Sequence, residues 1–199
     1  MKLIIITGFL GSGKTTVLMS LARYLGQDLE PKDIVIIENE IGEANVDGRL
    51  LSETAYEVRD LTAGCICCTL SGEFIGAMEE IRRDLDPQWL LIEATGIAHQ
   101  TIADVVSQSV PGLKPFSIVL VDAPRWEDLM ENLPMLVSTQ VERADCILIN
   151  KVDSVSEEDL ARVEEDVRDI NDQTPLHKIS AVSRDLDDLW RQVVGYAAS

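Results

Sequence analysis

A glycine-rich segment at residues 8–15, with the sequence GFLGSGKT, constrains the fold of this chain more than any other feature. It matches the phosphate-binding pattern G-x-x-x-x-G-K-[S/T] and directly follows residues 3–7, an apolar and largely β-branched run that is typical of a buried strand. In such a segment the backbone amides surround an anion at the point where a helix begins. The sequence therefore predicts a strand, a loop that encloses phosphate groups, and a helix that starts near Thr15.

The same loop carries side chains suited to a nucleoside triphosphate and its magnesium ion. We expect Lys14 to lie against the β- and γ-phosphates as a positive charge, and the Thr15 hydroxyl to complete the coordination of Mg²⁺. The alternative is a glycine-rich turn that binds nothing, but such a turn does not require Lys and Thr at these positions. The predicted nucleotide contacts of the loop are Gly8, Gly11, Ser12, Gly13, Lys14 and Thr15, with Thr16 in the first turn of the helix.

Length and composition favour one domain. The chain has 199 residues, of which 46% are hydrophobic, and no segment resembles a flexible linker, so we expect residues 1–199 to form a single domain. The formal net charge of −18 would repel a nucleic acid or an anionic membrane at long range. We therefore expect no nucleic-acid partner and no membrane partner, and we predict cations or basic protein surfaces instead.

Several features favour a cytoplasmic protein. Residues 3–10 have the length of a signal-peptide core, but a single lysine precedes them and no small-residue cleavage site follows. No apolar stretch reaches the roughly 18 residues that are needed to span a bilayer. Cys65, Cys67 and Cys68 lie too close together in the sequence to pair readily with one another, which fits a reducing compartment.

Short apolar runs with strand character alternate with segments of helical periodicity. This alternation predicts an α/β fold of the P-loop NTPase type, with a mainly parallel central sheet flanked by helices on both faces. Residues 156–169 predict a helix capped by Ser156, whereas the polar segment 39–60 predicts a functional loop. The predicted strands are residues 3–7, 34–37, 89–92, 118–121 and 146–149.

A second motif, residues 150–153 with the sequence NKVD, indicates guanine as the base. The Asp153 carboxylate can accept two parallel hydrogen bonds from guanine N1–H and the N2 amino group, which adenine does not offer, so the motif would select GTP over ATP. We expect Asn150 to support the loop and the stem of Lys151 to lie along the base. A strand-ending turn rich in Asn and Asp is the alternative. The predicted base contacts are Asn150, Lys151, Asp153 and, through the backbone, Ser180 and Ala181.

Acidic residues near predicted strand ends are suited to the hydrolytic chemistry. Glu93 closes an apolar strand, where it could hold a Mg²⁺-bound water, and the backbone of Gly96 could reach the γ-phosphate. Asp47 could complete the Mg²⁺ shell or position the attacking water, and Glu40 and Glu43 are further candidates for metal and water contacts. A solvent-exposed position is the alternative for each of these acids. The predicted catalytic residues are Lys14, Glu93 and Asp47.

The segment GCICC contains three closely spaced thiols, Cys65, Cys67 and Cys68, which can converge on one soft metal ion. They supply three ligands, so a tetrahedral Zn²⁺ needs a fourth, for which we favour Glu40, and an incomplete shell suits metal transfer rather than permanent structure. A redox-active thiol cluster and plain packing residues are the alternatives. Cys146 lies within a predicted strand and is expected to be a core residue.

Taken together, these motifs resemble those of the CobW-type P-loop GTPases, relatives of nickel-enzyme maturation GTPases and of cobalamin-enzyme GTPase chaperones. The resemblance rests on GFLGSGKTT, ENEIGE at residues 38–43, GCICC, EATG at residues 93–96 and NKVD, in this order. It covers nearly the whole chain. CobW-type proteins usually carry a second, C-terminal domain and often a histidine-rich tract, and we expect this chain to hold the GTPase domain alone.

The resemblance implies a GTP-dependent metal chaperone. Such a protein binds GTP or GDP with Mg²⁺, holds Zn²⁺ or Co²⁺ (with Ni²⁺ as a further candidate) at its cysteine motif, and passes the metal to a client metalloenzyme or corrinoid protein. No arginine stands out in the sequence as a catalytic finger in cis, so we expect slow intrinsic GTP hydrolysis and a possible GTP-dependent homodimer. The alternative is a regulatory GTPase switch that gates the cofactor loading of such a partner. An ATP-dependent small-molecule kinase is a more distant possibility.

Overall fold

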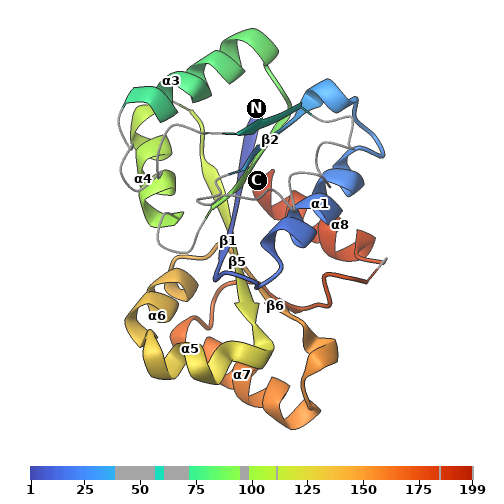
Figure 1. Ribbon diagram of the computed structural model, residues 1–199. Coiled ribbons are helices and arrows are strands. Elements are labelled where there is room, and N and C mark those ends of the chain that lie inside the picture. Colours follow the sequence, from blue (N-terminus) through green and yellow to red (C-terminus); the bar gives the residue numbers. More distant parts are fainter. Residues whose placement is uncertain (39–56, 61–71, 95–98, 111, 184, 199) are drawn as a thin grey trace.

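A single parallel sheet forms the centre of the molecule (Figure 1). The computed structural model describes residues 1–38, 57–60, 72–94, 99–110, 112–183 and 185–198. Within them, the sheet has seven strands in the order β3-β2-β4-β1-β5-β6-β7, and every recorded pairing is parallel. The strands are β1 (Lys2–Gly8), β2 (Ile34–Glu38), β3 (Glu57–Asp60), β4 (Trp89–Glu93), β5 (Pro115–Asp122), β6 (Cys146–Asn150) and β7 (Leu176–Lys178).

Helices cover both faces of the sheet, as the sequence predicts. Figure 1 shows α1 beside α8 in one group, α3 beside α4 in a second, and α5, α6 and α7 in a third. The helices are α1 (Lys14–Leu25), α3 (Gly72–Glu80), α4 (His99–Ser109), α5 (Trp126–Asn132), α6 (Pro134–Glu142), α7 (Glu157–Ile170) and α8 (Asp187–Ala197). Short helical turns are Pro31–Asp33, Ile81–Leu85, Ala123–Arg125 and Val152–Ser154.

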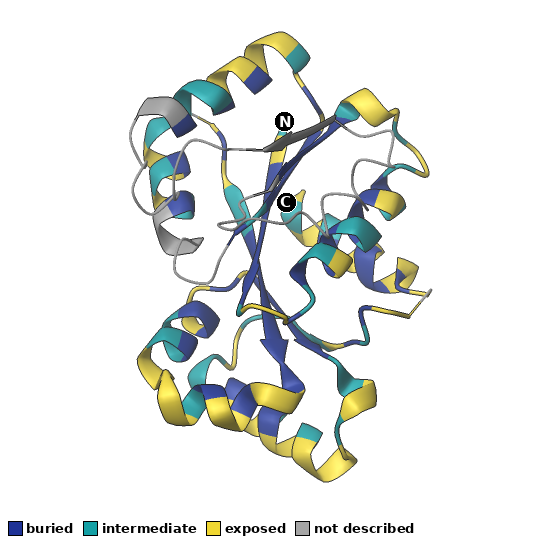
Figure 2. Ribbon diagram, in the orientation of Figure 1, coloured by how far each residue is buried: buried dark blue, intermediate teal, exposed yellow. Residues whose placement is uncertain are grey.

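The alternation of side chains along β1 explains why both faces are covered. Ile4 and Ile6 pack into the cluster that contains α1 and α8, whereas Leu3 and Ile5 pack into the cluster that contains α3 and α4. Successive strand residues point to opposite faces, so a strand that is apolar at every position needs packing partners on each side. Strands β1, β4, β5 and β6 accordingly lie largely buried between layers of half-exposed helices, whereas β7 is partly exposed (Figure 2).

Strand β5 shows that the second face is shared between two groups of helices. Val119 and Val121 lie in a third cluster, which they form with α5, α6 and α7, and Ile118 and Leu120 lie in the cluster of α1 and α8. Cys146 of β6 is fully buried in the latter cluster, which confirms that it is a core residue. Burial raises the pKa of its thiol to about 12.

The predicted elements agree with the structure at most places and fail at one. Helix α1 begins at Lys14, one residue before the predicted start, and Ser156 caps α7 by accepting a hydrogen bond from the backbone of Asp159 at 3.1 Å. The prediction of one functional loop over residues 39–60 is wrong at its end, because Glu57–Asp60 forms the edge strand β3 beside β2. The backbone hydrogen bonds of β2 stabilise this strand although its sequence lacks apolar alternation.

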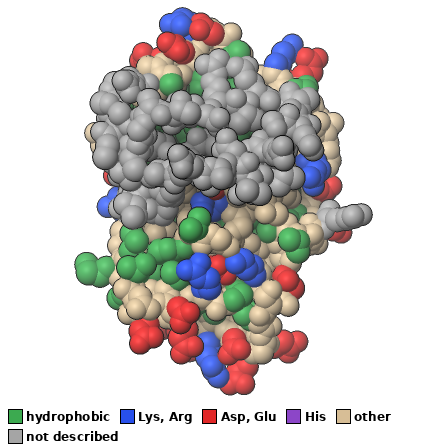
Figure 3. All heavy atoms as spheres, viewed as in Figure 1, with side chains coloured by type: hydrophobic (Ala, Val, Ile, Leu, Met, Phe, Trp, Pro, Cys, Tyr) green, Lys and Arg blue, Asp and Glu red, His purple; other side chains and the backbone are tan. Residues whose placement is uncertain are grey.

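On the face that Figure 3 shows, the described part of the surface mixes acidic, basic and apolar side chains. Within the described segments, no helix is both long enough and apolar enough to cross a membrane. The large hydrophobic side chains that are exposed there are Leu10, Leu133, Met135, Val182 and Tyr196.

Candidate nucleotide-binding site

The carboxyl ends of the central strands meet at one edge of the sheet. Ile6 of β1 pairs with Glu93 of β4, and Asp122 of β5 lies directly opposite Asn150 of β6. In an open parallel sheet this edge is where ligands bind. The structure therefore gathers the glycine-rich loop after β1, the acid that ends β4 and the NKVD segment after β6 at a single edge.

The glycines of the loop are required by its backbone and by its close packing. Gly13 has a φ of +97°, and a Cβ atom at this position would lie 2.5 Å from Nδ2 of Asn150. Gly8 has a φ of +149°, and a Cβ atom there would lie 2.7 Å from the carbonyl oxygen of Leu120. Only glycine adopts such φ values without strain, and only glycine leaves room for these contacts. The loop is therefore built directly against β5 and β6.

Lys14 is held within the loop. Its side chain is 9% exposed, and Nζ donates a hydrogen bond to the carbonyl oxygen of Phe9 at 3.3 Å. The same ammonium lies 3.9 Å from Oε1 of Glu93. The positive charge thus lies between the loop backbone and the end of β4, next to the helix N-terminus, where an anion is favoured.

Thr15 and Glu93 form the part of the site that fits a magnesium ion. The hydroxyl of Thr15 donates a hydrogen bond to Oε2 of Glu93 at 2.8 Å, and the Glu93 side chain is only 15% exposed. Hydroxyl and carboxylate oxygens are the ligands that Mg²⁺ prefers, and the ion usually keeps several waters. The residues present therefore fit the group: Thr15 would hold the ion and Glu93 would hold one of its waters.

The Ser12 side chain is buried within the glycine-rich loop. Its backbone N–H donates to the carbonyl oxygen of Phe9 at 3.1 Å, and its hydroxyl is buried without a hydrogen-bond partner among the described residues. Thr16, by contrast, is exposed in the first turn of α1. Ser12 and Thr16 both remain predicted nucleotide contacts.

Asn150 joins the base-binding segment to the phosphate loop. Its Nδ2 donates to the carbonyl oxygen of Ser12 at 2.7 Å, and its Oδ1 accepts from the backbone N–H of Ala181 at 2.8 Å. Asn150 is 1% exposed, so both hydrogen bonds are shielded from water. One side chain therefore holds three segments together, as the expected supporting role requires.

Asp153 is exposed at the other end of the motif. The hydroxyl of Ser180 hydrogen-bonds to its carboxylate and is the main cause of the lowered pKa of Asp153, with a smaller contribution from Ser154. An ionised carboxylate that accepts hydrogen bonds is suited to the two N–H groups on the edge of guanine. Ser180, which was predicted as a backbone contact to the base, therefore also hydrogen-bonds to Asp153 through its side chain.

Asp122 and Arg125 were missed by the sequence analysis. Asp122 ends β5, and its carboxylate accepts a hydrogen bond from Nζ of Lys151 at 2.9 Å. Arg125 lies in the following turn, where Nη1 donates to the carbonyl oxygen of Leu10 at 2.8 Å. An acid at the end of an apolar strand is a signal that could have identified Asp122, as it identified Glu93. No local pattern indicates Arg125.

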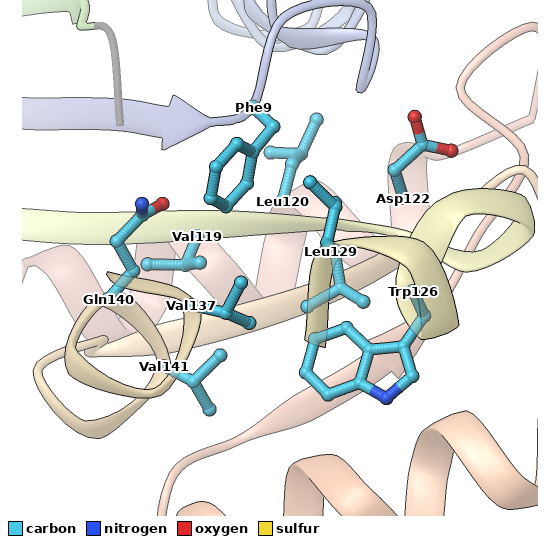
Figure 4. A pocket seen from close by; sticks show the side chains of 10 residues that line it. Phe9, Val119, Leu120, Asp122, Trp126, Leu129, Val137, Gln140 and Val141 are labelled. Atoms are coloured by element: carbon cyan, nitrogen blue, oxygen red, sulfur yellow. The ribbon is translucent and has the colours of Figure 1, made fainter. Parts of the chain in front are cut away.

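A small cavity lies beneath Phe9, between β5 and the helices α5 and α6 (Figure 4). Its volume is about 10 Å³, close to the smallest space that can hold one water molecule. The side-chain nitrogen of Gln140, which is buried, has no hydrogen-bond partner in the parts of the chain that are described. With a volume of about 10 Å³, the cavity is too small for a nucleotide. Its lining residues are Phe9, Val119, Leu120, Val121, Asp122, Trp126, Leu129, Val137, Gln140 and Val141.

Several predicted site residues lie outside the described residues. Among the residues that are described, no group of three or more His, Cys, Asp or Glu side chains could hold a metal ion. The predicted metal ligands and switch residues in question are Glu40, Glu43, Asp47, Cys65, Cys67, Cys68 and Gly96.

Comparison with known proteins identifies relatives across the chain. The family model "CobW/HypB/UreG, nucleotide-binding domain" matches residues 2–178. The chain is 34% identical over 198 residues to the zinc chaperone YjiA of Escherichia coli, covering 94% of this chain and 59% of that protein. It is 32% identical to the zinc chaperone CobW of Pseudomonas aeruginosa, covering 82% of this chain and 52% of that protein. The chain thus spans about half the length of the curated relatives it matches.

Solved structures share the fold. The crystal structure of HypB from Helicobacter pylori in complex with nickel superposes with a TM-score of 0.65 at 20% identity, covering 100% of this chain and 87% of that one. The Zn(II)-bound YjiA GTPase from E. coli superposes with a TM-score of 0.60 at 24% identity, covering 92% of this chain and 59% of that one. At such identities the likeness concerns the architecture alone.

Proposed function

The chain belongs to the CobW/HypB/UreG nucleotide-binding domain family, whose members are GTPase domains, and we propose that it couples GTP binding and hydrolysis to the delivery of a thiophilic divalent metal. The metal is the cargo, carried by Cys65, Cys67 and Cys68 with Glu40 as a fourth ligand. The recipient is a client metalloenzyme or corrinoid protein in the cytoplasm. We further propose that residues 1–199 act as one domain.

One observation carries the nucleotide part of this proposal. Through Asn150, the loop that would enclose the phosphates is hydrogen-bonded to the segments that would bind the base, at 2.7 Å to Ser12 and 2.8 Å to Ala181. A site that must bind both ends of one ligand needs the two ends at a fixed separation. With Asp153 as the acceptor for guanine N1–H and the N2 amino group, the ligand is GTP rather than ATP.

In the hydrolytic reaction the chain's own residues bind and orient the triphosphate. Mg²⁺ supplies charge neutralisation at the phosphate oxygens when it is bound. Thr15 and Glu93 would hold that ion and its water, Lys14 would stabilise the charge that develops on the γ-phosphate, and the amide of Gly96 would contact the same group. Asp47 would orient the attacking water. We assign no arginine finger in cis, since Arg125 donates to the carbonyl oxygen of Leu10, and we expect slow turnover, well below about one per second.

The identity of the metal is supported by the names of the relatives. YjiA and CobW are called zinc chaperones, and a Dictyostelium discoideum protein that is 27% identical is called zinc-regulated GTPase metalloprotein activator 1. Thiolate ligands favour Zn²⁺, and they also bind Co²⁺ and Ni²⁺, so supply and geometry decide between these ions. Zn²⁺ is the cargo we favour, and a homodimer that forms on GTP binding belongs to the same proposal.

A second candidate function is favoured by the name of the Dictyostelium relative, which describes an activator of metalloproteins. In that case the chain would be a GTP switch that docks on its partner, and the cysteines would be structural or redox-sensing. The two functions make opposite demands on Cys67, because a switch of this kind does not need the thiolate to carry metal.

Replacing Cys67 with serine separates the two functions. We expect C67S to lose stoichiometric Zn²⁺ binding under reducing conditions while it retains GDP affinity, and a C146A control, which changes a buried core thiol, to bind both. Metal content is measured by elemental analysis and nucleotide affinity by calorimetry, with ATP as competitor. Full Zn²⁺ binding by C67S, or equal affinity for ATP and GTP, would overturn the proposed function.

A further inference from the structure

Asp122 is a buried carboxylate that the hydrolytic chemistry does not use. It is the last residue of β5, it lies opposite Asn150 in the register of β5 with β6, and its side chain is 0% exposed. Its carboxylate points away from the apolar side chains of the small cavity that it borders (Figure 4). A carboxylate at this depth is retained in a fold only when a charged or hydrogen-bonding partner compensates the loss of water.

Lys151 is the charged partner of this carboxylate. Its ammonium lies 2.9 Å from Oδ2 of Asp122, while Oδ1 of Asp122 has no hydrogen-bond partner in the described part of the chain. The ion pair is asymmetric, because the Lys151 side chain is 34% exposed and the Asp122 side chain is not exposed at all. Withdrawing the ammonium would leave a buried negative charge without compensation, so the geometry strongly favours the paired state.

The backbone of Lys151 is also constrained. Lys151 has a φ of +64° and a ψ of +35°, and it is one of two non-glycine residues with a positive φ in the described segments. A residue with a side chain adopts this left-handed conformation only when the surrounding contacts hold it there. Lys151 directly follows Asn150, and its backbone conformation directs its long side chain from the end of β6 back toward Asp122 at the end of β5. Both ends of the Lys151 side chain are therefore fixed.

We propose that Asp122 is a positioning residue for nucleotide binding: it holds the ammonium of Lys151 so that the aliphatic stem of Lys151 forms a fixed platform for the guanine base. The stem of a lysine is apolar and packs well against a flat ring while its charge stays with a polar partner. Without the anchor the stem would sample many rotamers, and the base would have to order it on binding. Asp122 thus acts through Lys151 and does not touch the base.

This inference rests on the proposed binding of guanine nucleotides. Its test distinguishes a failure of the Asp122 inference from a failure of that proposal. Purified wild-type protein is titrated with GDP, with inosine diphosphate, which lacks the N2 amino group, and with ADP. The same titrations are run with D122N, which keeps the shape of the side chain but removes its charge. D104N is the matched control, because Asp104 also forms an ion pair, 3.6 Å from Arg143, but at an exposed position.

We expect D122N to bind GDP about tenfold more weakly than wild type, the size of effect that loss of one charge-assisted hydrogen bond produces. Inosine diphosphate should weaken by the same factor, because Asp153, which reads the N2 amino group, is unchanged. At saturating GTP, kcat should stay within about twofold, since the phosphate loop is not altered. D104N should bind GDP as tightly as wild type.

The possible results are distinct. A wild-type protein that fails to bind GDP overturns the proposed function and this inference with it. Wild-type binding with unchanged GDP affinity in D122N overturns the inference alone, and a fall in kcat at unchanged affinity does the same. A purely structural Asp122 would lower the midpoint of thermal unfolding without changing GDP affinity at temperatures below it.

If D122N does not fold, K151M and the double variant D122N/K151M replace it. The double variant removes both charges and leaves no buried ion unpaired. We expect K151M and the double variant to bind GDP about tenfold more weakly than wild type, and to preserve the ratio of GDP to inosine diphosphate affinity. Wild-type affinity in either of them would overturn the anchoring role of Asp122.

Discussion

Nδ2 of Asn150 lies 2.7 Å from the carbonyl oxygen of Ser12, although 138 positions separate the two residues in the chain. The same side chain accepts from the backbone of Ala181, so the end of β6, the glycine-rich loop and the segment after β7 share one buried hydrogen-bonding group. A substitution in any of the three segments is therefore expected to alter the structure of the other two. This coupling is the basis of the first two predictions.

Replacing Asn150 with alanine should destabilise the protein and weaken nucleotide binding together. The change leaves a buried carbonyl and a buried N–H without partners, which costs about 1–3 kcal/mol for each group. Chemical denaturation measures the free energy of unfolding, and calorimetry measures the affinity for GDP. Asn132, whose exposed side chain bonds to the carbonyl oxygen of Asp128, provides the control, and N132A should change stability by less than about 0.5 kcal/mol. A stable N150A with wild-type GDP affinity would contradict the account.

Replacing Gly13 with alanine tests how closely the glycine-rich loop approaches Asn150. In G13A the new methyl group would meet Nδ2 of Asn150 at 2.5 Å, and the backbone φ of +97° would become strained. We expect G13A to lose GDP affinity at least tenfold, because the loop must shift and its amides no longer converge on the phosphates. Gly76 lies in helix α3 with no heavy atom within 4 Å of a Cβ position, so G76A should stabilise the protein by about 0.5–1 kcal/mol. Similar effects of the two substitutions would contradict the structure.

Local sequence patterns could predict the central strands and the positions of their ends. Each of these strands is apolar at successive positions, and the residues that follow them carry the chemistry, so the convergence of Lys14, Glu93 and Asn150 at one edge follows from parallel strand order. The edge strand Glu57–Asp60 could not be predicted, because its pairing with β2 stabilises a sequence that is polar and lacks strand periodicity.

The side-chain partners of the site could not be predicted either, since they depend on distances across the sheet. The bond from Lys151 to Asp122 and the bond from Arg125 to Leu10 join residues 29 and 115 positions apart. No local pattern encodes such pairs. The burial of the Ser12 hydroxyl close to Gly8 is likewise not encoded in the loop motif.

Replacing Arg125 with alanine tests whether its hydrogen bond to Leu10 stabilises the glycine-rich loop. Its hydrogen bond to the carbonyl oxygen of Leu10 is exposed, and such a bond contributes roughly 0.5–1.5 kcal/mol. We expect R125A to weaken GDP binding two- to tenfold, by about that energy, and to leave kcat at saturating GTP nearly unchanged. Steady-state kinetics separates kcat from KM. A loss of kcat by a hundredfold or more would instead identify Arg125 as a catalytic finger in cis.

The pKa of Asp153 provides a test by pH. The hydroxyl of Ser180 favours the ionised carboxylate and lowers the pKa of Asp153 below its ordinary value of 3.8. A lowered pKa in the folded state means that the contribution to stability is complete above the pKa of the unfolded chain and is lost as pH falls through the folded pKa. S180A should therefore raise the pKa of Asp153 toward 3.8, as followed by carboxyl chemical shifts in an NMR titration. An unchanged titration in S180A would contradict the assigned contact.

Cys146 should be unreactive in the native protein. It is 0% exposed, and burial raises the pKa of its thiol to about 12, so the thiolate that reacts with alkylating reagents is negligible at pH 8. We expect iodoacetamide at pH 8 to modify Cys146 only after denaturation, as measured by peptide mass spectrometry. Rapid labelling of native Cys146 would show that strand β6 is not packed as described, and would also complicate any thiol-based metal assay.

We propose that the nucleotide site and the thiolate site are linked. The most direct measurement is the Zn²⁺ affinity of the reduced protein, determined by competition with a chelator in the presence of a non-hydrolysable GTP analogue and again with GDP. The account predicts that the two affinities differ by at least about fivefold, and that Zn²⁺ changes the ratio of analogue to GDP affinity by the same factor. Equal Zn²⁺ affinities in the two nucleotide states would contradict it.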